Sequence, residues 1–114
     1  MSECVFCGIA RGEIDAEVVA EDSAWVAFRD LEPQAPVHVL VIPRRHVASL
    51  DALDEEGAGP LAAALLAACV RVARAEGLEE GYRVLTNVGE EGGQAIQHLH
   101  FHLLGGRRMG WPPG

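Results

Sequence analysis

Three histidines recur at every second position near the C-terminus, at His98, His100 and His102, within an otherwise apolar run. Because side chains alternate along a strand, a strand over residues 98–104 places all three imidazoles on one face and leaves the apolar residues for a core. Imidazole can attack an electrophile, transfer protons near neutral pH or bind a metal ion. The run therefore predicts either a metal site or a phosphate-handling catalytic face, with His100 as the nucleophile between its neighbours.

Further polar residues can join this face. His38 alternates with apolar residues in a predicted strand, and it completes the cluster if that strand lies beside the histidine run. Asp30 follows another predicted strand, where a carboxylate can accept hydrogen bonds from the vicinal hydroxyls of a ribose. The glycine-rich loop over 89–93 lacks the Gly-Lys-Ser/Thr ending of a Walker loop. Its backbone N–H groups can still approach a phosphate closely.

Two cysteines near the N-terminus favour a separate metal site. Cys4 and Cys7 have the spacing of a zinc half-site, and His46 and His98 can supply the other two ligands. Four protein ligands leave no open position, so such a zinc ion is structural and would tie an N-terminal helix to the sheet. Cys69 lies in an apolar helical stripe and is expected to be inert core. The competing hypothesis is a catalytic metal centre formed by the three histidines themselves.

Length and charge limit the class of protein. A chain of 114 residues, 49% hydrophobic, fits a single globular domain over residues 1–114. The formal charge of −8, with arginine as the only basic residue type besides histidine, argues against binding to a nucleic-acid backbone. No apolar run is long enough to span a membrane, and the N-terminal residues do not resemble a signal peptide. We therefore expect a cytoplasmic protein with no membrane or nucleic-acid partner.

The elements that position these residues can be read from periodicity and from turn residues. The sequence predicts a short N-terminal helix with Ser2 as N-cap, one long helix, and strands in hairpin order, which together indicate an α+β fold with an antiparallel sheet. The long helix carries an apolar stripe wider than one sheet face needs, so we expect a homodimer contact on it. The predicted ranges are helices 2–12 and 54–77 and strands 17–20, 24–28, 37–42, 82–86 and 98–104.

Taken together, these motifs resemble a known family. The run 98–104 resembles the histidine-triad (HIT) signature, and residues 105–114 are similar to the C-terminal tail of its Hint branch of nucleotide-binding proteins. The Cys4–Cys7 pair resembles the zinc-binding bacterial type. The resemblance implies a five-stranded antiparallel sheet with one long helix and a short N-terminal helix, paired into a homodimer. Further matches are residues 28–30, 33–38, 41–46 and 81–83, and Asn87.

The resemblance also implies an activity. Such proteins hydrolyse or transfer nucleoside monophosphates from 5′-phosphoramidates and related AMP or GMP adducts, through a covalent nucleotide on the residue matching His100. His102 and His38 would contact phosphate oxygens and orient the nucleophile. A structural zinc ion on Cys4, Cys7, His46 and His98 is implied, and no organic cofactor. The alternatives are a dinucleoside polyphosphate hydrolase, which the Trp-Pro-Pro-Gly ending disfavours, and a nucleotide-binding scaffold with vestigial catalysis.

The remaining site residues follow from the same resemblance. Asp30 would bind the ribose, and Trp111 would reach the site of the partner subunit on the tail 105–114. The chain departs from many members at Ala95, where they carry a serine whose hydroxyl would assist the leaving group. The phosphate would also contact Asn87 and the backbone near Gly93 and Gln94, and the base pocket would be formed by Phe6, Ile9, Phe28 and Leu40.

Overall fold

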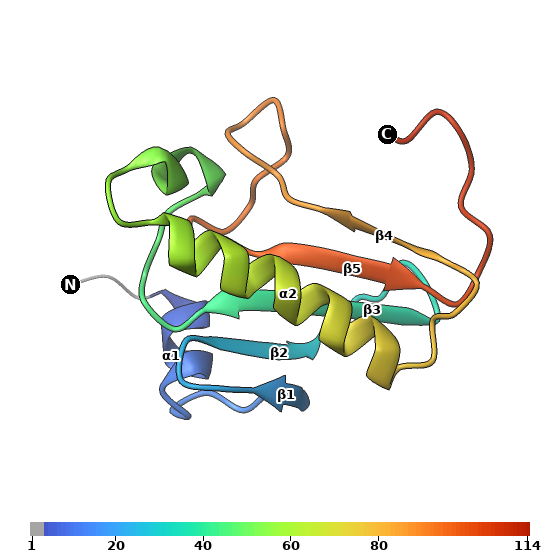
Figure 1. Cartoon of the computed structure of the whole chain (residues 1–114), viewed down its shortest axis with the longest axis horizontal. Coiled ribbons are helices and arrows are strands. Elements are labelled where there is room, and N and C mark those ends of the chain that lie inside the picture. The colour runs from blue at the N-terminus through green and yellow to red at the C-terminus, as the bar shows by residue number, and fades with distance from the viewer. Residues whose placement is uncertain (1–3) are drawn as a thin grey trace.

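The computed structural model describes residues 4–114 and contains one five-stranded antiparallel sheet with two α-helices (Figure 1). The strand order is β1-β2-β3-β5-β4, so β3 and β5 lie side by side in the interior of the sheet. This arrangement confirms the predicted α+β class. The elements in chain order are α1 (Val5–Ala10), β1 (Val18–Glu21), β2 (Trp25–Arg29), β3 (Val37–Pro43), a 3-10 helix (Leu50–Asp54), α2 (Gly59–Ala75), β4 (Tyr82–Leu85) and β5 (Phe101–Gly105).

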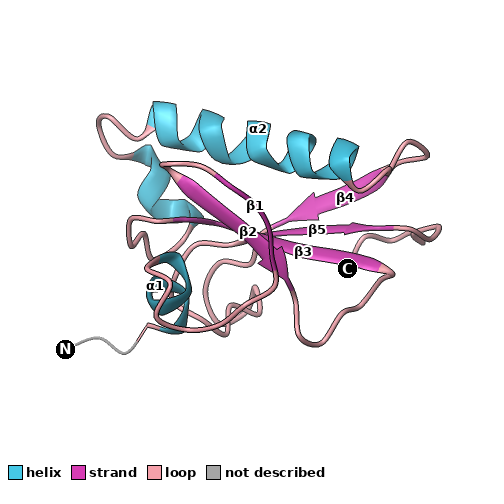
Figure 2. Cartoon of the chain, turned by 90° about the horizontal axis from the view of Figure 1, so that it is seen from below, coloured by secondary structure: helices cyan, strands magenta, loops and turns pink. Residues whose placement is uncertain are grey.

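The two α-helices cover opposite faces of the sheet, α2 over most of one face and α1 over part of the other (Figure 2). Alternate residues of β3 divide between the two resulting cores, because successive side chains of a strand point to opposite faces. Val39 and Val41 pack with Leu65 of α2, whereas Leu40 and Ile42 pack with Phe6 of α1. A strand covered on both faces carries a continuous apolar run, as the sequence of β3 does.

The long helix is shorter at its N-terminus than the sequence predicts. Residues 54–77 were expected as one helix, but a separate 3-10 helix ends at Asp54 and α2 begins only at Gly59. Gly57 lies between them with φ of 86°, a conformation that breaks a right-handed helix. Pro60 then fits the first turn of α2, where its missing N–H costs no helical bond. α2 ends at Ala75, two residues before the predicted Gly77, and the φ of 73° at Gly77 confirms this glycine as the residue that stops the helix.

The N-terminal helix begins two residues later than the proposed cap implies. Ser2 lies outside the described residues, and Cys4 is the N-cap of α1, with its sulfur accepting a hydrogen bond from the Cys7 backbone N–H. Neither α1 nor α2 combines the length and the hydropathy that a membrane-spanning helix needs, which holds for the whole described range 4–114.

The histidine run differs from prediction in its backbone and agrees in its side chains. The strand β5 begins at Phe101, not His98, since its ladder with β3 ends at the pair of Val41 with Phe101 and its ladder with β4 ends at the pair of Leu85 with His102. The preceding backbone bonds to loops and side chains instead, as in the bond from Leu99 N–H to the Val47 carbonyl. The alternation still holds, with Leu99, Phe101 and Leu103 in the core beneath α2 and the three histidines on the α1 side.

Candidate functional site

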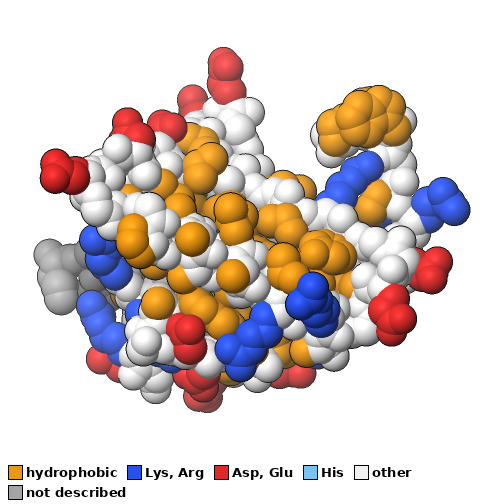
Figure 3. All heavy atoms as spheres, viewed as in Figure 1, with side chains coloured by type: hydrophobic (Ala, Val, Ile, Leu, Met, Phe, Trp, Pro, Cys, Tyr) orange, Lys and Arg blue, Asp and Glu red, His pale blue; other side chains and the backbone are white. Residues whose placement is uncertain are grey.

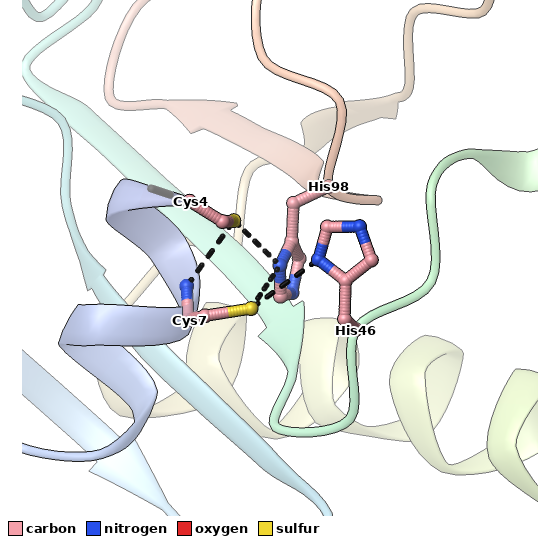
Figure 4. Close-up of side chains that lie close together, drawn as sticks. All are labelled: Cys4, Cys7, His46 and His98. Carbon is pink, nitrogen blue, oxygen red and sulfur yellow. Dashed lines mark hydrogen bonds between the residues drawn. The ribbon is translucent and has the colours of Figure 1, made fainter. Parts of the chain in front are cut away.

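Four predicted metal ligands converge at one end of α1 (Figure 4). The ligand atoms of Cys4, Cys7, His46 and His98 all lie within 4.8 Å of one another, although the residues come from three separate segments. Cys4 and Cys7 lie at the start of α1, His46 in the loop after β3, and His98 in the segment before β5. The sequence prediction that these four residues lie together is therefore correct.

The geometry of this cluster fits a tetrahedral metal ion. The distances from Sγ of Cys4 and of Cys7 to His98 Nδ1 are 3.3 and 3.5 Å, and Cys7 Sγ lies 3.2 Å from His46 Nδ1. Zinc bound by sulfur and nitrogen at its usual bond lengths separates these atoms by about 3.6 Å. His98 Nε2 lies 2.9 Å from the Pro43 carbonyl and donates to it, so Nδ1 keeps its lone pair for a metal.

Burial favours the neutral forms of the Cys7 thiol and the His98 ring when no metal ion is bound. Burial, followed by the hydrogen bond from Cys4 and its charge, raises the pKa of the Cys7 thiol. Burial likewise lowers the pKa of His98, which keeps its imidazole neutral. Two adjacent thiolates are therefore unfavourable by themselves, and a bound divalent cation offsets their repulsion as the thiols lose their protons. Cys69 is different, since it is buried in the core with its pKa raised to about 11.

A chain of hydrogen bonds fixes which nitrogen of His38 and of His102 carries a proton. The Gln34 backbone N–H donates to Nδ1 of His38, so the proton of the neutral His38 ring lies on Nε2. His38 Nε2 is 2.9 Å from His102 Nδ1 and donates to it, which leaves the His102 proton on Nε2. Asp30 Oδ2 lies 3.4 Å from the same His38 nitrogen. The register places the two rings together, because His38 and His102 lie on the paired strands β3 and β5.

The possible ligand atoms of Asp30, His38 and His102 also lie within 4.8 Å of one another, as the ligands of a metal ion would. A single proton between His38 Nε2 and His102 Nδ1 satisfies both nitrogens without a metal ion. A separation of 2.9 Å between His38 Nε2 and His102 Nδ1 is the length of a hydrogen bond. The geometry thus favours a proton-positioning pair here over a metal centre.

His100 is held with one nitrogen free. Its Nδ1 lies 2.7 Å from the His98 carbonyl and donates to it, so the lone pair of the neutral ring is on Nε2. Within residues 4–114, neither Nε2 of His100 nor Nε2 of His102 has a hydrogen-bond partner. Every fully buried side-chain nitrogen in this range has one, so these two atoms are not fully buried. Both Nε2 atoms therefore reach an accessible space. The two rings lie 5.1 Å apart between centroids.

That space is a cavity of about 400 Å³ between α1 and the sheet. It is lined by His100, His102 and Asp30, and by the four residues predicted for a base pocket, Phe6, Ile9, Phe28 and Leu40. His38 is not part of the lining and lies behind His102 as a buried side chain. The cavity therefore combines the Nε2 lone pair of His100, the Nε2–H of His102 and the carboxylate of Asp30 with apolar walls. Ala95, the position where many family members carry a serine, also lines the cavity. Lining residues that the sequence did not indicate are Val5, Asp15, Ala16, Arg29, Leu31, Glu32 and Ile96.

Asn87, Gly93 and Gln94 shape the loop beside the cavity and do not line it. The backbone N–H groups of Gly93 and Gln94 already donate to the Glu90 and Gly89 carbonyls. Asn87 Nδ2 donates to the Gly92 carbonyl, and Gln94 Nε2 donates to the Ala48 and Ile96 carbonyls. A phosphate contact with these groups would have to replace bonds within the loop. A buried glutamine that bridges two loops was not foreseen from the sequence.

A larger hollow of about 570 Å³ lies elsewhere, at the end of α2 beside the start of β4. Its lining includes Arg83, Arg107 and Arg108 and contains no histidine. Trp111, the residue predicted to reach a partner subunit, is 83% exposed and lines neither space. The chemistry therefore belongs to the smaller cavity with His100.

Burial sets the protonation of the histidine pair. Burial first, and then the charges of His100 and His38, lower the pKa of His102 to about 4, against a smaller opposing effect of Asp30. Burial also lowers the pKa of His38, and Asp30 again opposes the shift. Both rings are therefore neutral at physiological pH, as the hydrogen-bond chain between them requires.

This depressed pKa makes stability depend on pH. His102 titrates near 6.5 when unfolded and about 4 when folded, so the unfolded chain binds more protons below pH 6.5 and stability falls with the pH. Lowering the pH from 7 to 5 should reduce the free energy of unfolding of the metal-free wild type more than that of the metal-free His102→Gln variant. The difference should be about 1 kcal/mol after allowance for solvent screening. Urea unfolding at both pH values measures this difference, and equal losses would contradict it.

The fold and the site together define an α+β protein with a cluster of histidines on one face of an antiparallel sheet. The chain belongs to the HIT domain family, whose model matches residues 11–109. It is 52% identical to a HIT-like protein from Synechococcus elongatus over the full length of both chains.

Solved structures agree with this assignment. A HIT family hydrolase from Legionella pneumophila is 50% identical and superposes with a TM-score of 0.94, covering 98% of this chain and 100% of that one. A histidine triad nucleotide-binding protein from Candida albicans is 32% identical, with a TM-score of 0.81 and coverage of 98% and 85%. These likenesses extend over nearly the whole of this chain, so its fold is that of the HIT family.

Proposed function

We propose that the protein is a hydrolase for nucleoside 5′-phosphoramidates or related AMP and GMP adducts, acting through a covalent nucleotide on His100. The observation that carries this proposal is the free Nε2 lone pair of His100, which reaches a cavity shared with Asp30 and apolar walls. The names of two relatives, a hydrolase and a nucleotide-binding protein, agree with such an activity.

The proposed reaction has two steps. His100 Nε2 attacks the α-phosphorus, and the bond from phosphorus to the leaving nitrogen breaks as the amine departs with a proton from water. The ring then carries a positive charge, which its Nδ1–H shares with the His98 carbonyl. The hydroxide left by that proton transfer next attacks phosphorus, the bond to Nε2 breaks, and the nucleoside monophosphate leaves with the His100 ring neutral again. Throughout, His102 Nε2–H is available to donate to a phosphoryl oxygen, held in place by His38.

Asp30 is proposed to select the ribose. Its Oδ1 accepts from the Glu32 backbone N–H, which fixes the carboxylate at the cavity wall with capacity left for the two hydroxyls. We expect Asp30→Asn to weaken AMP binding about tenfold and to change binding of the 2′,3′-dideoxy analogue little. Calorimetric titration of both ligands measures the difference. Equal weakening for the two ligands would remove Asp30 from hydroxyl recognition.

A competition assay tests the proposed reaction class. Purified protein is given an AMP amide and a diadenosine polyphosphate together, and the products are separated while intact-mass analysis seeks a nucleotidyl adduct on the chain. Preference for the amide, with an adduct that maps to His100, is the expected result. Preference for the polyphosphate would overturn the reaction class. Binding without turnover of any activated AMP donor would favour the scaffold reading, which the alanine at position 95 of the cavity lining makes worth testing.

The assembly is also part of the proposal. Apolar side chains remain exposed on α2 and on the edge strand β4, among them Leu66, Val70, Tyr82 and Val84 (Figure 3). We propose that a second copy of this single-domain chain covers this surface, and that each tail carries Trp111 towards the partner subunit. Zinc is proposed as the structural metal of Cys4, Cys7, His46 and His98, because their spacing fits its tetrahedral preference.

A further inference from the structure

One short helix belongs to both sites of the molecule. The sulfur atoms of Cys4 and Cys7, at the N-terminus of α1, form half of the four-ligand cluster. Val5, Phe6 and Ile9 of the same six-residue helix line the cavity that contains His100. Possible metal ligands and cavity-lining residues therefore alternate over about one and a half turns of this helix.

Apart from the apolar packing of Phe6, Ile9 and Ala10 against the sheet, few contacts fix α1 in place. A helix of six residues is not stable on its own in water, so its position depends on tertiary contacts. At its C-terminal end, Arg44 Nη1 donates to the Ala10 carbonyl at 2.7 Å. At its N-terminal end, the side-chain polar contacts to the rest of the described chain are those of the two sulfurs with His46 and His98. No disulfide joins α1 to the sheet.

Phe6 connects the two sites physically. Its ring packs edge-on against His98 of the cluster, with centroids 5.9 Å apart, and against His100 at 5.1 Å. It also packs against Phe28 of the cavity wall at 5.5 Å. Phe6 is only 5% exposed, so a shift of α1 displaces a buried ring that touches the proposed nucleophile. The pocket cannot keep its shape if α1 moves.

From this arrangement we infer that metal binding at the four-ligand cluster and nucleotide binding in the cavity are positively coupled through α1. The inference rests on the proposed function, since it concerns the same pocket. Metal fixes α1 against the sheet and completes the wall that contacts the base; without metal, part of the nucleotide's binding free energy is spent on ordering α1. Cys4 and Cys7 are thus positioning residues, which act on the nucleotide through Phe6 and Ile9.

Coupling of this kind is reciprocal. If metal raises the affinity for a nucleotide by some factor, the nucleotide must raise the affinity for metal by the same factor. We expect a factor of about ten, within the usual range of couplings between sites in one domain. A nucleotide fragment without a base does not contact the wall formed by α1, so ribose 5-phosphate should show almost no coupling.

The experiment measures zinc affinity of the full chain by competition with a chromophoric chelator, alone, with saturating AMP and with saturating ribose 5-phosphate. The converse titration measures the Kd of AMP with zinc-loaded protein and with zinc-free protein. We expect AMP to tighten zinc binding about tenfold, zinc to tighten AMP binding by the same factor, and ribose 5-phosphate to change zinc affinity less than twofold. The Phe6→Ala variant should keep its zinc ligands and lose most of the coupling.

The outcomes separate this inference from the proposed function. If AMP binds the zinc-loaded chain and leaves its zinc affinity unchanged, the coupling is refuted and the proposed function stands. If ribose 5-phosphate tightens zinc binding as much as AMP does, ligands stabilise the whole fold and the route through α1 is refuted. If AMP binds in neither metal state, the proposed function fails and this inference fails with it.

Discussion

Replacing His100 with glycine is expected to lower the turnover of an AMP amide by roughly four powers of ten while changing the Kd of AMP only a few-fold. The substitution removes the nitrogen that reaches the cavity, and with it the covalent path. The groups proposed to bind the ribose and the base remain, so binding of the product is retained. Single-turnover kinetics and calorimetry measure the two effects separately.

Rescue provides the control for this variant. The glycine leaves an imidazole-sized space, so added imidazole should restore part of the turnover by taking the place of the missing ring. Because the Nδ1 bond to the His98 carbonyl orients the native ring, rescue should be incomplete. Turnover that is unchanged in His100→Gly would remove this residue from the mechanism, whatever the imidazole does.

Removing the metal is expected to cause the largest change in stability. A ligand that binds only the folded chain stabilises it by about 4 kcal/mol when its free concentration is 1,000 times its Kd. For a chain of this length that corresponds to a fall in Tm of about 15 °C when zinc is withdrawn. Thermal unfolding with zinc and with a strong chelator measures the effect, and the Cys7→Ser variant should unfold near the chelated temperature under both conditions.

Cys69→Ala is the matched control for this experiment. Cys69 lies on the buried face of α2 and belongs to the core, away from the four-ligand cluster. Its truncation should lower Tm modestly through lost packing and leave the response to zinc intact. A wild-type chain whose Tm is the same with zinc and with chelator, and which carries no zinc by elemental analysis, would contradict the metal assignment.

Much of the sheet follows from local patterns. The hairpin of β1 and β2, the buried strand β3 and the glycine that stops α2, Gly77, all agree with prediction, because apolar periodicity and turn residues are local properties. Two boundaries were wrong for reasons that are not local. The start of α2 depends on Gly57, and β5 is shorter than the histidine run because its ladders with β3 and β4 end before they reach His98.

In the candidate site, too, local sequence patterns predict some features and miss others. The Cys4–Cys7 spacing and the alternating histidines predicted residues that the structure brings to the four-ligand cluster and to the cavity. The cavity also contains all four residues expected to contact a base. By resemblance, the backbone near Gln94 was expected to contact the phosphate, whereas in the structure its N–H donates to the Gly89 carbonyl. The Gln94 side chain, for which the sequence predicted no role, joins the glycine loop to the Ala48 and Ile96 carbonyls. Asp15 and Ile96 line the cavity without any signal in the sequence, since neither belongs to a motif.

The sequence by itself determined which chemical groups are present and which of them share a face, because alternation along a chain is a property of the backbone. Only the tertiary structure decided which nitrogen of each ring is free. The partners that fix those protons come from distant segments, the Gln34 backbone for His38 and the Pro43 carbonyl for His98. Proton positions depend on such contacts in three dimensions, and no spacing of residues along the chain encodes them.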